Sequence, residues 1–392
     1  MATFITAPTT TTSTGVDAKA DNYNLWRNED IDSRLYELNI ATPVFYKILE
    51  LAVPRSTTVQ ARFDWGEDDI IQDHSAINNT GGYDAVATSI VVDDGSIFRV
   101  NDAVYAPSTG EIMLVTAIST NTLTVTRGWQ GSTGAIIADD AVLLILHFEL
   151  EEGGNAPTAL ASIPAEKYNY ISQFSRTVNV TELNDNTDIR FNISQLSYQT
   201  MKEAFQIRKD IGKQFMWGKR AKGSITGNVY NTGGVAYWMT SNGLSAVGAN
   251  LTWADFNNNF MQAFEPTGSS PSKLLVCGPD VYADIDNITH GKTTFSGYVD
   301  TLGAVVKRIV LSGGYTIDIV PDPYTFRRDL GLQNKGYLMD TAYMQTRVMN
   351  GMDLQWKQNI QSPSAHVRTD EIYGAMGLQI ENPTLHGSIT LS

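Results

Sequence analysis

The chain has 392 residues and a formal net charge of −14, so it is long enough to form more than one hydrophobic core. Its acidity argues against a general binder of nucleic acid or of anionic membranes, although a local basic surface stays open. Charged residues make up 18% of the chain, below the usual share of about 25%, which suggests a surface that is partly covered by partners.

The cysteine count and the apolar runs narrow the class of protein further. Cys277 is the single cysteine, which excludes an intrachain disulfide and favours a reducing site of synthesis. No stretch of 18 apolar residues predicts a membrane-spanning helix, and no secretory leader pattern opens the chain. We therefore expect a soluble protein that is synthesised inside a cell.

The N-terminal part divides into three kinds of sequence. Residues 1–21 are rich in threonine and poor in large apolar side chains, so they predict an arm that becomes ordered only on a neighbour. Residues 22–51 mix apolar and charged positions and predict short helical pieces lying on another surface. From Ser56 to Trp65, apolar and polar side chains alternate as in a half-exposed strand.

A strand-rich segment follows at residues 87–147. It contains five short β-type runs, separated by turn sequences such as Asp93-Asp94-Gly95. The runs are Ser89–Val92, Ala103–Tyr105, Ile112–Ile118, Thr122–Thr126 and Val142–Leu146. Five strands in so short a segment predict a small all-β barrel or sandwich inserted into a loop of a larger fold.

The longest predicted helix, the spine helix, covers residues 194–222. Ala204, Ile207, Ile211 and Phe215 form one apolar row, and Leu196, Met201, Phe205 and Met216 form a neighbouring one. Ser194 is a suitable N-cap, and Gly223 a suitable stop. The β-type run Tyr168–Leu183 precedes this helix.

The C-terminal half alternates strands and helices. The periodicities predict a strand at Leu274–Val276, a helix beginning at Pro279, and a hairpin of Val305–Leu311 with Tyr315–Val320. Long strands are predicted at Gly336–Val348, Leu354–Gln361 and His366–Ile380. The complete pattern is that of an α+β protein.

The residues that usually carry catalysis occur here without the spacing that catalysis needs. Gly291-Lys292-Thr293 resembles the end of a phosphate-binding loop, but Asp286 stands where the leading glycine should be. Cys277 lies in an apolar run, as a buried structural cysteine does. The five histidines form no metal-binding pair. We therefore predict no enzyme, no metal site and no cofactor.

The basic character of the spine helix is unusual in so acidic a chain. Seven basic residues stand against only Glu203 and Asp210, and they are Lys202, Arg208, Lys209, Lys213, Lys219, Arg220 and Lys222. They could pair with acidic faces of neighbouring chains or domains, or they could face packaged nucleic acid and attract it without sequence preference. The residues leave both interpretations open.

The order of these parts resembles the major capsid proteins of tailed double-stranded-DNA phages. Local sequence supports the likeness, in a family with a β-rich insertion in its extended loop (E-loop). The similar stretches are Phe63-Asp64-Trp65, Thr109-Gly110-Glu111, Leu114-Val115-Thr116, Val125-Thr126-Arg127-Gly128 and Tyr168–Thr181.

This resemblance implies a division of the chain into the parts of that fold. The N-terminal arm would cover residues 1–50 and the E-loop residues 51–182, with the inserted β domain at 87–147. The P-domain would comprise residues 183–265 with the spine helix, and residues 337–392 would return to it as strands. The A-domain would comprise residues 266–336.

The same resemblance implies a structural function in the virion. Such proteins assemble into hexamers and pentamers of an icosahedral shell around double-stranded DNA, with scaffold, portal and decoration proteins as further partners and no membrane. Arg62, Phe63, Trp65 and Glu67 are then the candidate E-loop contacts between subunits.

Two other functions fit the same residues. One is an encapsulin-like compartment shell that encloses protein cargo. The other is a virion surface protein whose β domain binds glycans, for which Trp129 is the candidate aromatic side chain.

Overall fold

The computed structural model describes two compact units of the chain. The described residues are 43–68, 71–154, 157, 159–185, 195–224, 228–239, 251–252, 260–266, 268–289, 307–311 and 313–391. The first unit contains the chain up to Phe63 and from Asn169 onward, and the second runs from Asp64 to Tyr168. The predicted arm lies outside the described residues up to position 42.

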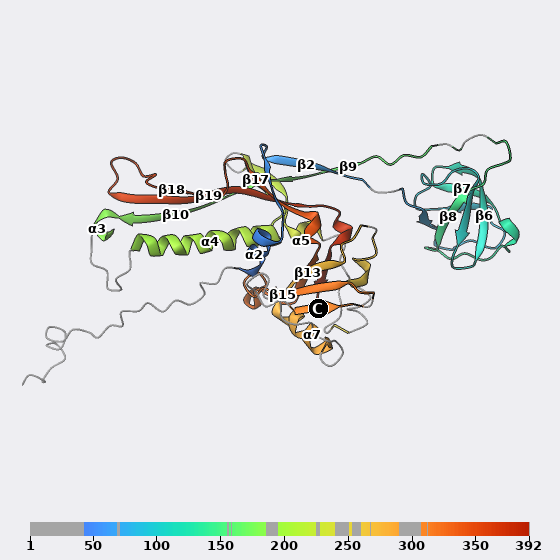
Figure 1. Ribbon diagram of the computed structural model, residues 1–392. Helices are drawn as coiled ribbons and strands as arrows, with labels where there is room; N and C mark the ends of the chain where they lie inside the picture. Colours follow the sequence, from blue (N-terminus) through green and yellow to red (C-terminus); the bar gives the residue numbers. More distant parts are fainter. Residues whose placement is uncertain are drawn as a thin grey trace, which may run out of the picture. The chain divides into compact units, whose positions relative to one another are not determined.

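A five-stranded sheet extends along the first unit (Figure 1). Its main path is β1 (Arg55–Thr58), β17 (Met344–Met349), β19 (Val367–Ile380) and β10 (Ser172–Thr181), and β18 (Gln355–Lys357) also pairs with β19. β1 runs parallel to β17, whereas all of β10 pairs antiparallel with β19. Both ends of the predicted E-loop at 51–182 therefore contain strands of this sheet.

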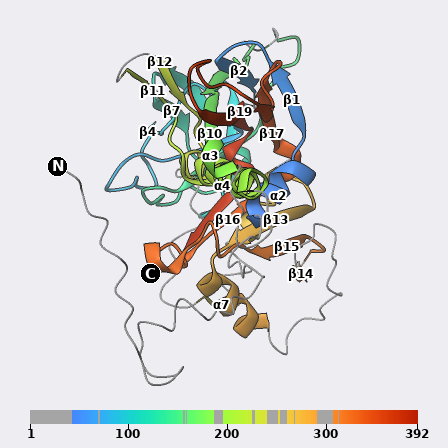
Figure 2. The ribbon, with the colours of Figure 1, turned by 90° about the vertical axis from the view of Figure 1, so that its left-hand side faces the viewer.

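The long helix α4 (Gln195–Trp217) lies along β10 and packs against it (Figure 1). The end-on view in Figure 2 shows α2 (Val44–Leu51) beside it. Ile207, Ile211 and Phe215 are buried, as the four-residue spacing predicts. The second predicted row is buried only in part, since Met201 is 41% exposed. The apolar stripe is therefore narrower than its sequence indicated.

The helix ends at Trp217, which corrects the predicted end at Lys222. The chain turns at Gly218 into an antiparallel pair, β11 (Ala221–Ser224) with β12 (Asn228–Asn231), and α5 (Val235–Trp238) follows. A Cβ atom on Gly218 would lie 2.3 Å from the carbonyl oxygen of Gln214 and 2.8 Å from that of Thr232. The returning loop thus packs directly on the last helical turn, and this close approach needs glycine.

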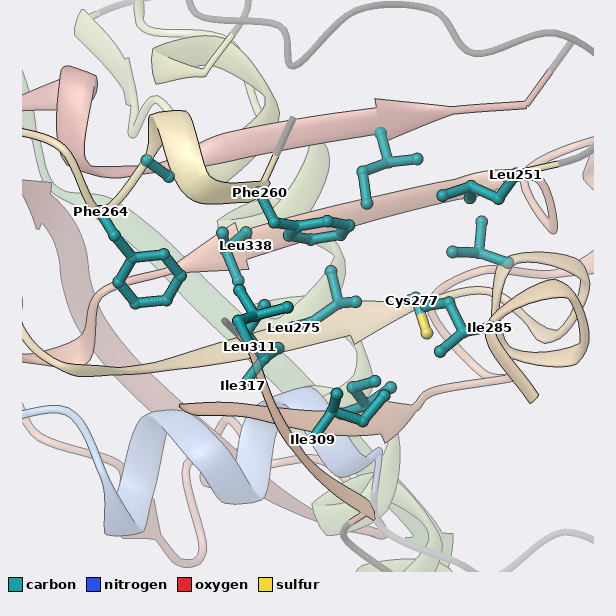
Figure 3. Packing of buried hydrophobic residues seen from close by; sticks show 14 of the residues in the cluster. Leu251, Phe260, Phe264, Leu275, Cys277, Ile285, Ile309, Leu311, Ile317 and Leu338 are labelled. Carbon is teal, nitrogen blue, oxygen red and sulfur yellow. The ribbon is translucent and has the colours of Figure 1, made fainter. Parts of the chain in front are cut away.

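A second sheet of five strands belongs to the same unit. Its order is β14 (Lys307–Val310), β15 (Thr316–Pro321), β13 (Ser272–Cys277), β16 (Lys335–Met339) and β20 (Gly387–Thr390). β14 and β15 form the predicted hairpin, and helix α7 (Pro279–Thr289) packs beside β15 and β16. Figure 3 shows the core of this region, where Phe260, Leu275 and Ile317 are buried together.

The C-terminal strands divide between the two sheets differently from the prediction. The expected boundary at 336/337 falls inside β16, and β20 pairs antiparallel with β16 instead of returning to the first sheet. A short turn at Thr341–Tyr343, where Asp340 accepts a hydrogen bond from the amide of Ala342, separates β16 from β17. Alternation in a strand tells which side chains face a core, and it does not tell which sheet the strand joins.

The second unit contains a six-stranded sheet. The strand order is β3 (His74–Ala76), β8 (Val142–Phe148), β5 (Asp102–Ala106), β6 (Glu111–Ser119), β7 (Thr122–Thr126) and β4 (Ser89–Val91). The two outer strands also meet, because Ile77 bridges Val92 and the amide of Asp93 donates to the carbonyl of Ala76 at 2.9 Å. The sheet closes into a small barrel, which leaves no free edge.

The barrel extends beyond the predicted limits of 87–147. The five predicted strands coincide with β4 to β8, but β3 and Ile77 precede residue 87, and Ile77 is fully buried in the barrel core. Residues 78–88, between Ile77 and β4, are exposed or half-buried and show no strand pattern. The sequence therefore did not indicate that β3 belongs to the barrel. The barrel is continuous with β2 (Arg62–Glu67) and β9 (Ala165–Tyr170), which form a two-stranded sheet of their own.

A buried ion pair organises one end of the barrel. Arg127 donates through Nε to Glu111 at 2.7 Å, and also to the carbonyl oxygens of Asp84 and Ala87. Burial opposes the charged form of Glu111, but the hydrogen bonds from Arg127, Ala135 and Gly128 outweigh it and lower the pKa of this carboxyl. The Thr-Gly-Glu and Thr-Arg-Gly sequences thus have a structural role in closing the loop at residues 128–135.

Candidate assembly surfaces

The seven basic residues of the predicted spine helix have different surroundings. Lys202, Arg208, Lys209 and Lys213 lie on α4, whereas Lys219, Arg220 and Lys222 follow it, the last in β11. Lys202, Lys213, Lys219 and Lys222 are exposed, and the other three are half-buried. The sequence pattern predicted one basic helical face, and the early end of α4 divides it.

The two arginines of this set contact aromatic side chains of the first unit. Arg208 donates a hydrogen bond to Tyr46 of α2; burial raises the pKa of this tyrosine, and the arginine opposes that rise. The guanidinium of Arg220 lies 5.4 Å from the ring centre of Tyr237 and 5.5 Å from that of Trp238. Such contacts hold both arginines against the protein and reduce their reach toward a ligand.

The two acidic residues of α4 connect the helix to the sheet. Arg176 of β10 donates through Nε to Asp210 at 2.8 Å, and its Nη1 lies 3.8 Å from Glu203. The hydrogen bond from Arg176 to Asp210 raises the pKa of the guanidinium. Lys213 shares the same carboxylate, with its Nζ 3.3 Å from Asp210. These partly exposed pairs fix the register of helix and strand more than they add stability.

A cleft of about 390 Å³ opens beside α4, where the described chain begins. Its walls come from α4, from the loop after β15 and from the residue that precedes α2, and they are Gln206, Lys209, Lys213, Pro323, Tyr324, Thr325, Arg327 and Pro43. The Nζ atom of Lys209 lies 5.5 Å from the ring centre of Tyr324. Three cationic side chains therefore surround one hollow.

A buried carboxylate holds the walls of this cleft in place. Asp322 is 0% exposed and accepts hydrogen bonds from the amide of Phe45 at 3.0 Å and from the hydroxyl of Thr325 at 2.7 Å. It also accepts from the amide of Tyr324 at 3.0 Å. Phe45 lies in the first turn of α2, so Asp322 caps that helix from a distant loop. No local sequence pattern predicts this contact, because the two residues are 277 positions apart in the chain.

The four candidate E-loop contacts separate into two kinds. Phe63 and Trp65 are buried within their own chain, at 6% and 9% exposure, whereas Arg62 is exposed and Glu67 is half-buried. Trp65 also donates through Nε1 to Glu67 at 2.8 Å. The two aromatic side chains are therefore core residues of the subunit, and the alternation that predicted a half-exposed strand identified their buried face.

Asn169, which sequence reasoning missed, forms a buried polar hub at the junction of β9 and β10. Its Nδ2 donates to the carbonyls of Leu378 at 2.6 Å and Gly233 at 3.0 Å, and its Oδ1 accepts from the amide of Gly233 at 2.8 Å. Thr232 joins the hub through a contact of 3.1 Å to Nδ2. The hub binds the end of β9, the loop after β12 and β19 to one another.

A second buried polar cluster joins β13, the end of β16 and the start of β20. The side chains of Lys273 and Asp340 are 0% and 1% exposed, with Nζ 3.5 Å from Oδ2. Burial lowers the pKa of Lys273, although Asp340 opposes this shift. His386 accepts from the amide of Asp340 at 3.1 Å and contacts the carbonyl of Glu381 at 3.1 Å.

The described residues contain no group of metal-binding side chains and no helix long and apolar enough to cross a membrane. Burial raises the pKa of the Cys277 thiol to about 12, as expected for a structural cysteine. Trp129 donates to Glu149 at 3.1 Å, so its polar edge has a partner within the barrel. The Gly291-Lys292-Thr293 stretch lies outside the described residues.

Comparison with known proteins identifies the family of this chain. A family model described as "SU10 major capsid protein" matches residues 7–391. The chain belongs to this family. It is therefore a structural protein of the virion, a major capsid protein that forms the icosahedral shell of a phage head, and not an enzyme. A search of curated proteins gives no match.

Solved structures from phages are similar to this chain. A structure from Mycobacterium phage Adephagia is 8% identical, with a TM-score of 0.51 over 96% of this chain and 98% of that chain. The capsid of Myoviridae phage XM1 is 12% identical, with a TM-score of 0.49 over 97% and 100%. The capsid of cyanophage P-SCSP1u is also 12% identical, with a TM-score of 0.45 over 95% and 94%. At 8% identity, the similarity to the Adephagia structure supports the fold and says nothing about function.

Proposed function

We propose that this capsid subunit assembles into hexamers and pentamers through the extended segments on either side of the barrel. In this arrangement the E-loop lies over the P-domain of a neighbouring subunit, and the N-terminal arm crosses the same neighbour. The sheet of β10 and β19 with α4 would be the P-domain, and the sheet of β13 to β16 would be the A-domain around the capsomer axis.

Exposed apolar side chains just before β2 and in the segment between β8 and β9 carry this proposal. Val59 is 71% exposed, Leu150 is 62% exposed and Ile163 is 89% exposed. A two-stranded sheet is marginally stable in water, and a large apolar side chain gains about 1.5–3 kcal/mol when it is buried. A second subunit that covers these segments would supply this burial, with Arg62 and Glu67 at the polar rim of the contact.

The barrel is proposed to be an insertion in the E-loop. Its closed sheet has a core of its own, and both of its connections lead to the β2 and β9 pair. A closed barrel presents no free edge to other strands. It can therefore stand at the outer surface or at a contact between capsomers, while the E-loop makes the contacts within a capsomer.

Packaged double-stranded DNA is the proposed second partner, through the exposed lysines Lys202, Lys219 and Lys222. Their side chains are exposed, and DNA attracts such cations without reading sequence. Arg208 and Arg220 are poorer candidates because their side chains are half-buried. Scaffold, portal and decoration proteins are the further partners expected of such a shell.

The assembly proposal is tested by a charge on the exposed apolar surface. Ile163→Asp should leave the melting temperature of the unassembled subunit unchanged and prevent shells from forming, as measured by sedimentation and negative-stain microscopy. Val86→Asp is the matched control, because Val86 is 77% exposed in a loop of the barrel. Normal shells from the Ile163→Asp variant would contradict the proposed contact.

The contents of assembled particles test the proposed DNA partner. Particles produced in infected cells should contain double-stranded DNA. Particles that enclose protein cargo without DNA would contradict this partner and would favour an encapsulin-like content.

A further inference from the structure

We propose that the acidic segment at residues 28–37 docks in the cleft between α4 and the loop after β15 of its own subunit. The inference goes beyond the assembly role because it concerns each subunit by itself, before any neighbour is present. It names the occupant of a basic hollow that no part of the described chain fills.

The charges of the cleft and of this segment are complementary. Lys209, Lys213 and Arg327 line the hollow, which has a volume of about 390 Å³. Residues 28–37 read Asn-Glu-Asp-Ile-Asp-Ser-Arg-Leu-Tyr-Glu, with four carboxylates against one arginine. Opposite charges in a partly enclosed hollow attract one another more strongly than the same charges in open water.

The point at which the chain enters makes the subunit's own segment the favoured occupant. Pro43 lines the cleft, and Asp322 fixes the adjacent first turn of α2 through the amide of Phe45. Glu37 precedes Pro43 by six residues, so an extended chain reaches at most about 20 Å from it. A tether this short gives an effective concentration in about the millimolar range, which favours even a weak contact.

The walls of the cleft suit a short peptide better than a DNA backbone. Lys213 lies 3.3 Å from Asp210 and Arg327 pairs with Asp329, so the net positive charge of the cleft is small and its attraction for a polyanionic backbone is weak. The ring of Tyr324 and the two prolines, Pro43 and Pro323, add an apolar surface. A segment that alternates carboxylates with Ile31 and Leu35 can use both kinds of wall, whereas a polyphosphate cannot.

Proteolysis of the unassembled full-length subunit tests this inference. A glutamate-specific protease should cleave slowly after Glu37 in the wild-type chain at low salt. The Lys209→Gln/Lys213→Gln variant should be cleaved about fivefold faster, a change that corresponds to the loss of two weak charge pairs. The matched control Lys219→Gln/Lys222→Gln, which removes two exposed lysines outside the cleft, should be cleaved at the wild-type rate.

Hydrogen exchange provides a second readout on the same proteins. Amides in residues 28–42 should be protected in the wild type and the control, and high salt should reduce this protection because it screens the charges. Equal rates in the cleft variant and the control would overturn the inference. Protection that rises with protein concentration would also overturn it, and would assign the cleft to the arm of a second copy.

The test separates this inference from the assembly proposal. Unchanged cleavage, combined with a lower DNA content in particles of the cleft variant, would make DNA the ligand and would also overturn the inference. Failure of the Ile163→Asp assembly test would leave the protease result intact, because that result comes from single subunits.

Discussion

His386 has its two ring nitrogens committed to partners of opposite character. Nδ1 accepts from the amide of Asp340, which leaves the proton on Nε2, where the carbonyl of Glu381 is 3.1 Å away. A second proton on Nδ1 would place two N–H groups against each other. Burial, which is the largest influence, and nearby Lys273 lower the pKa of His386 to about 4, while Glu381 and Asp340 oppose the shift.

This depressed pKa predicts acid-labile packing around β16 and β20. The unfolded chain binds a proton near pH 6.5, whereas the folded chain does so only near pH 4, so stability is fully present above pH 6.5 and falls as the pH falls. The free energy of unfolding should decrease by about 3 kcal/mol between these values. Melting curves of the unassembled subunit from pH 7 to pH 4 measure this.

Replacement of His386 by a residue that does not titrate should reduce the pH dependence of the melting temperature. His386→Gln is expected to lower the melting temperature at pH 7 and to lose less stability on acidification than the wild type does. His366→Gln is the control, because the His366 side chain is 91% exposed. An equal loss in the His386→Gln variant would mean that other groups carry the acid response.

At the scale of elements, the two glycines of the spine helix region should respond in opposite ways. A Cβ on Gly212 would meet only the Cβ of Tyr46, at 3.9 Å, which is ordinary contact. Gly212→Ala should therefore stabilise the subunit by about 0.5–1 kcal/mol, since alanine is the better helix former.

Gly218→Ala should instead destabilise the subunit, by about 1–3 kcal/mol, because its Cβ would meet two backbone oxygens that have no room to move. Denaturant unfolding of both variants compares the two effects directly. Equal changes would contradict the view that the close approach at Gly218 ends α4.

The barrel is predicted to fold as an isolated fragment only when β3 is included. Residues 71–150 contain all six strands and the Glu111–Arg127 ion pair, so they should give dispersed amide signals in an NMR spectrum. Residues 87–147 lack β3 and Ile77 and should give a collapsed spectrum, because the barrel cannot close. A folded 87–147 fragment would show that β3 is dispensable.

At the scale of the whole molecule, the low fraction of charged residues, 18%, is typical of a subunit whose surface is partly covered by neighbours. We predict that deletion of residues 2–21 leaves the melting temperature of the unassembled subunit unchanged and lowers that of the shell by several degrees. The physical reason is that these residues hold too few apolar side chains to order themselves and need a neighbour. Differential scanning calorimetry of subunits and shells measures both transitions, and an unchanged shell transition would contradict the role of the arm.

The sequence alone determined those features of this protein that depend on neighbours along the chain. The periods of four in Ile207, Ile211 and Phe215 predicted the helix that the structure contains, and short β-type runs between turn sequences predicted β4 to β8. The order of parts and the short similar stretches led to the major capsid proteins of phages, and the match over residues 7–391 establishes the SU10 major capsid protein family.

Only the tertiary structure decided which segments meet. It placed β16 and β17 in different sheets, buried Phe63 and Trp65 within the subunit, and ended α4 where the loop at Thr232 packs against it. It also brought Asp322 to α2 and Asn169 to β19. Local patterns predict which side of a helix or strand is buried. Which other element it packs against depends on contacts between residues far apart in the chain, and local patterns do not contain that information.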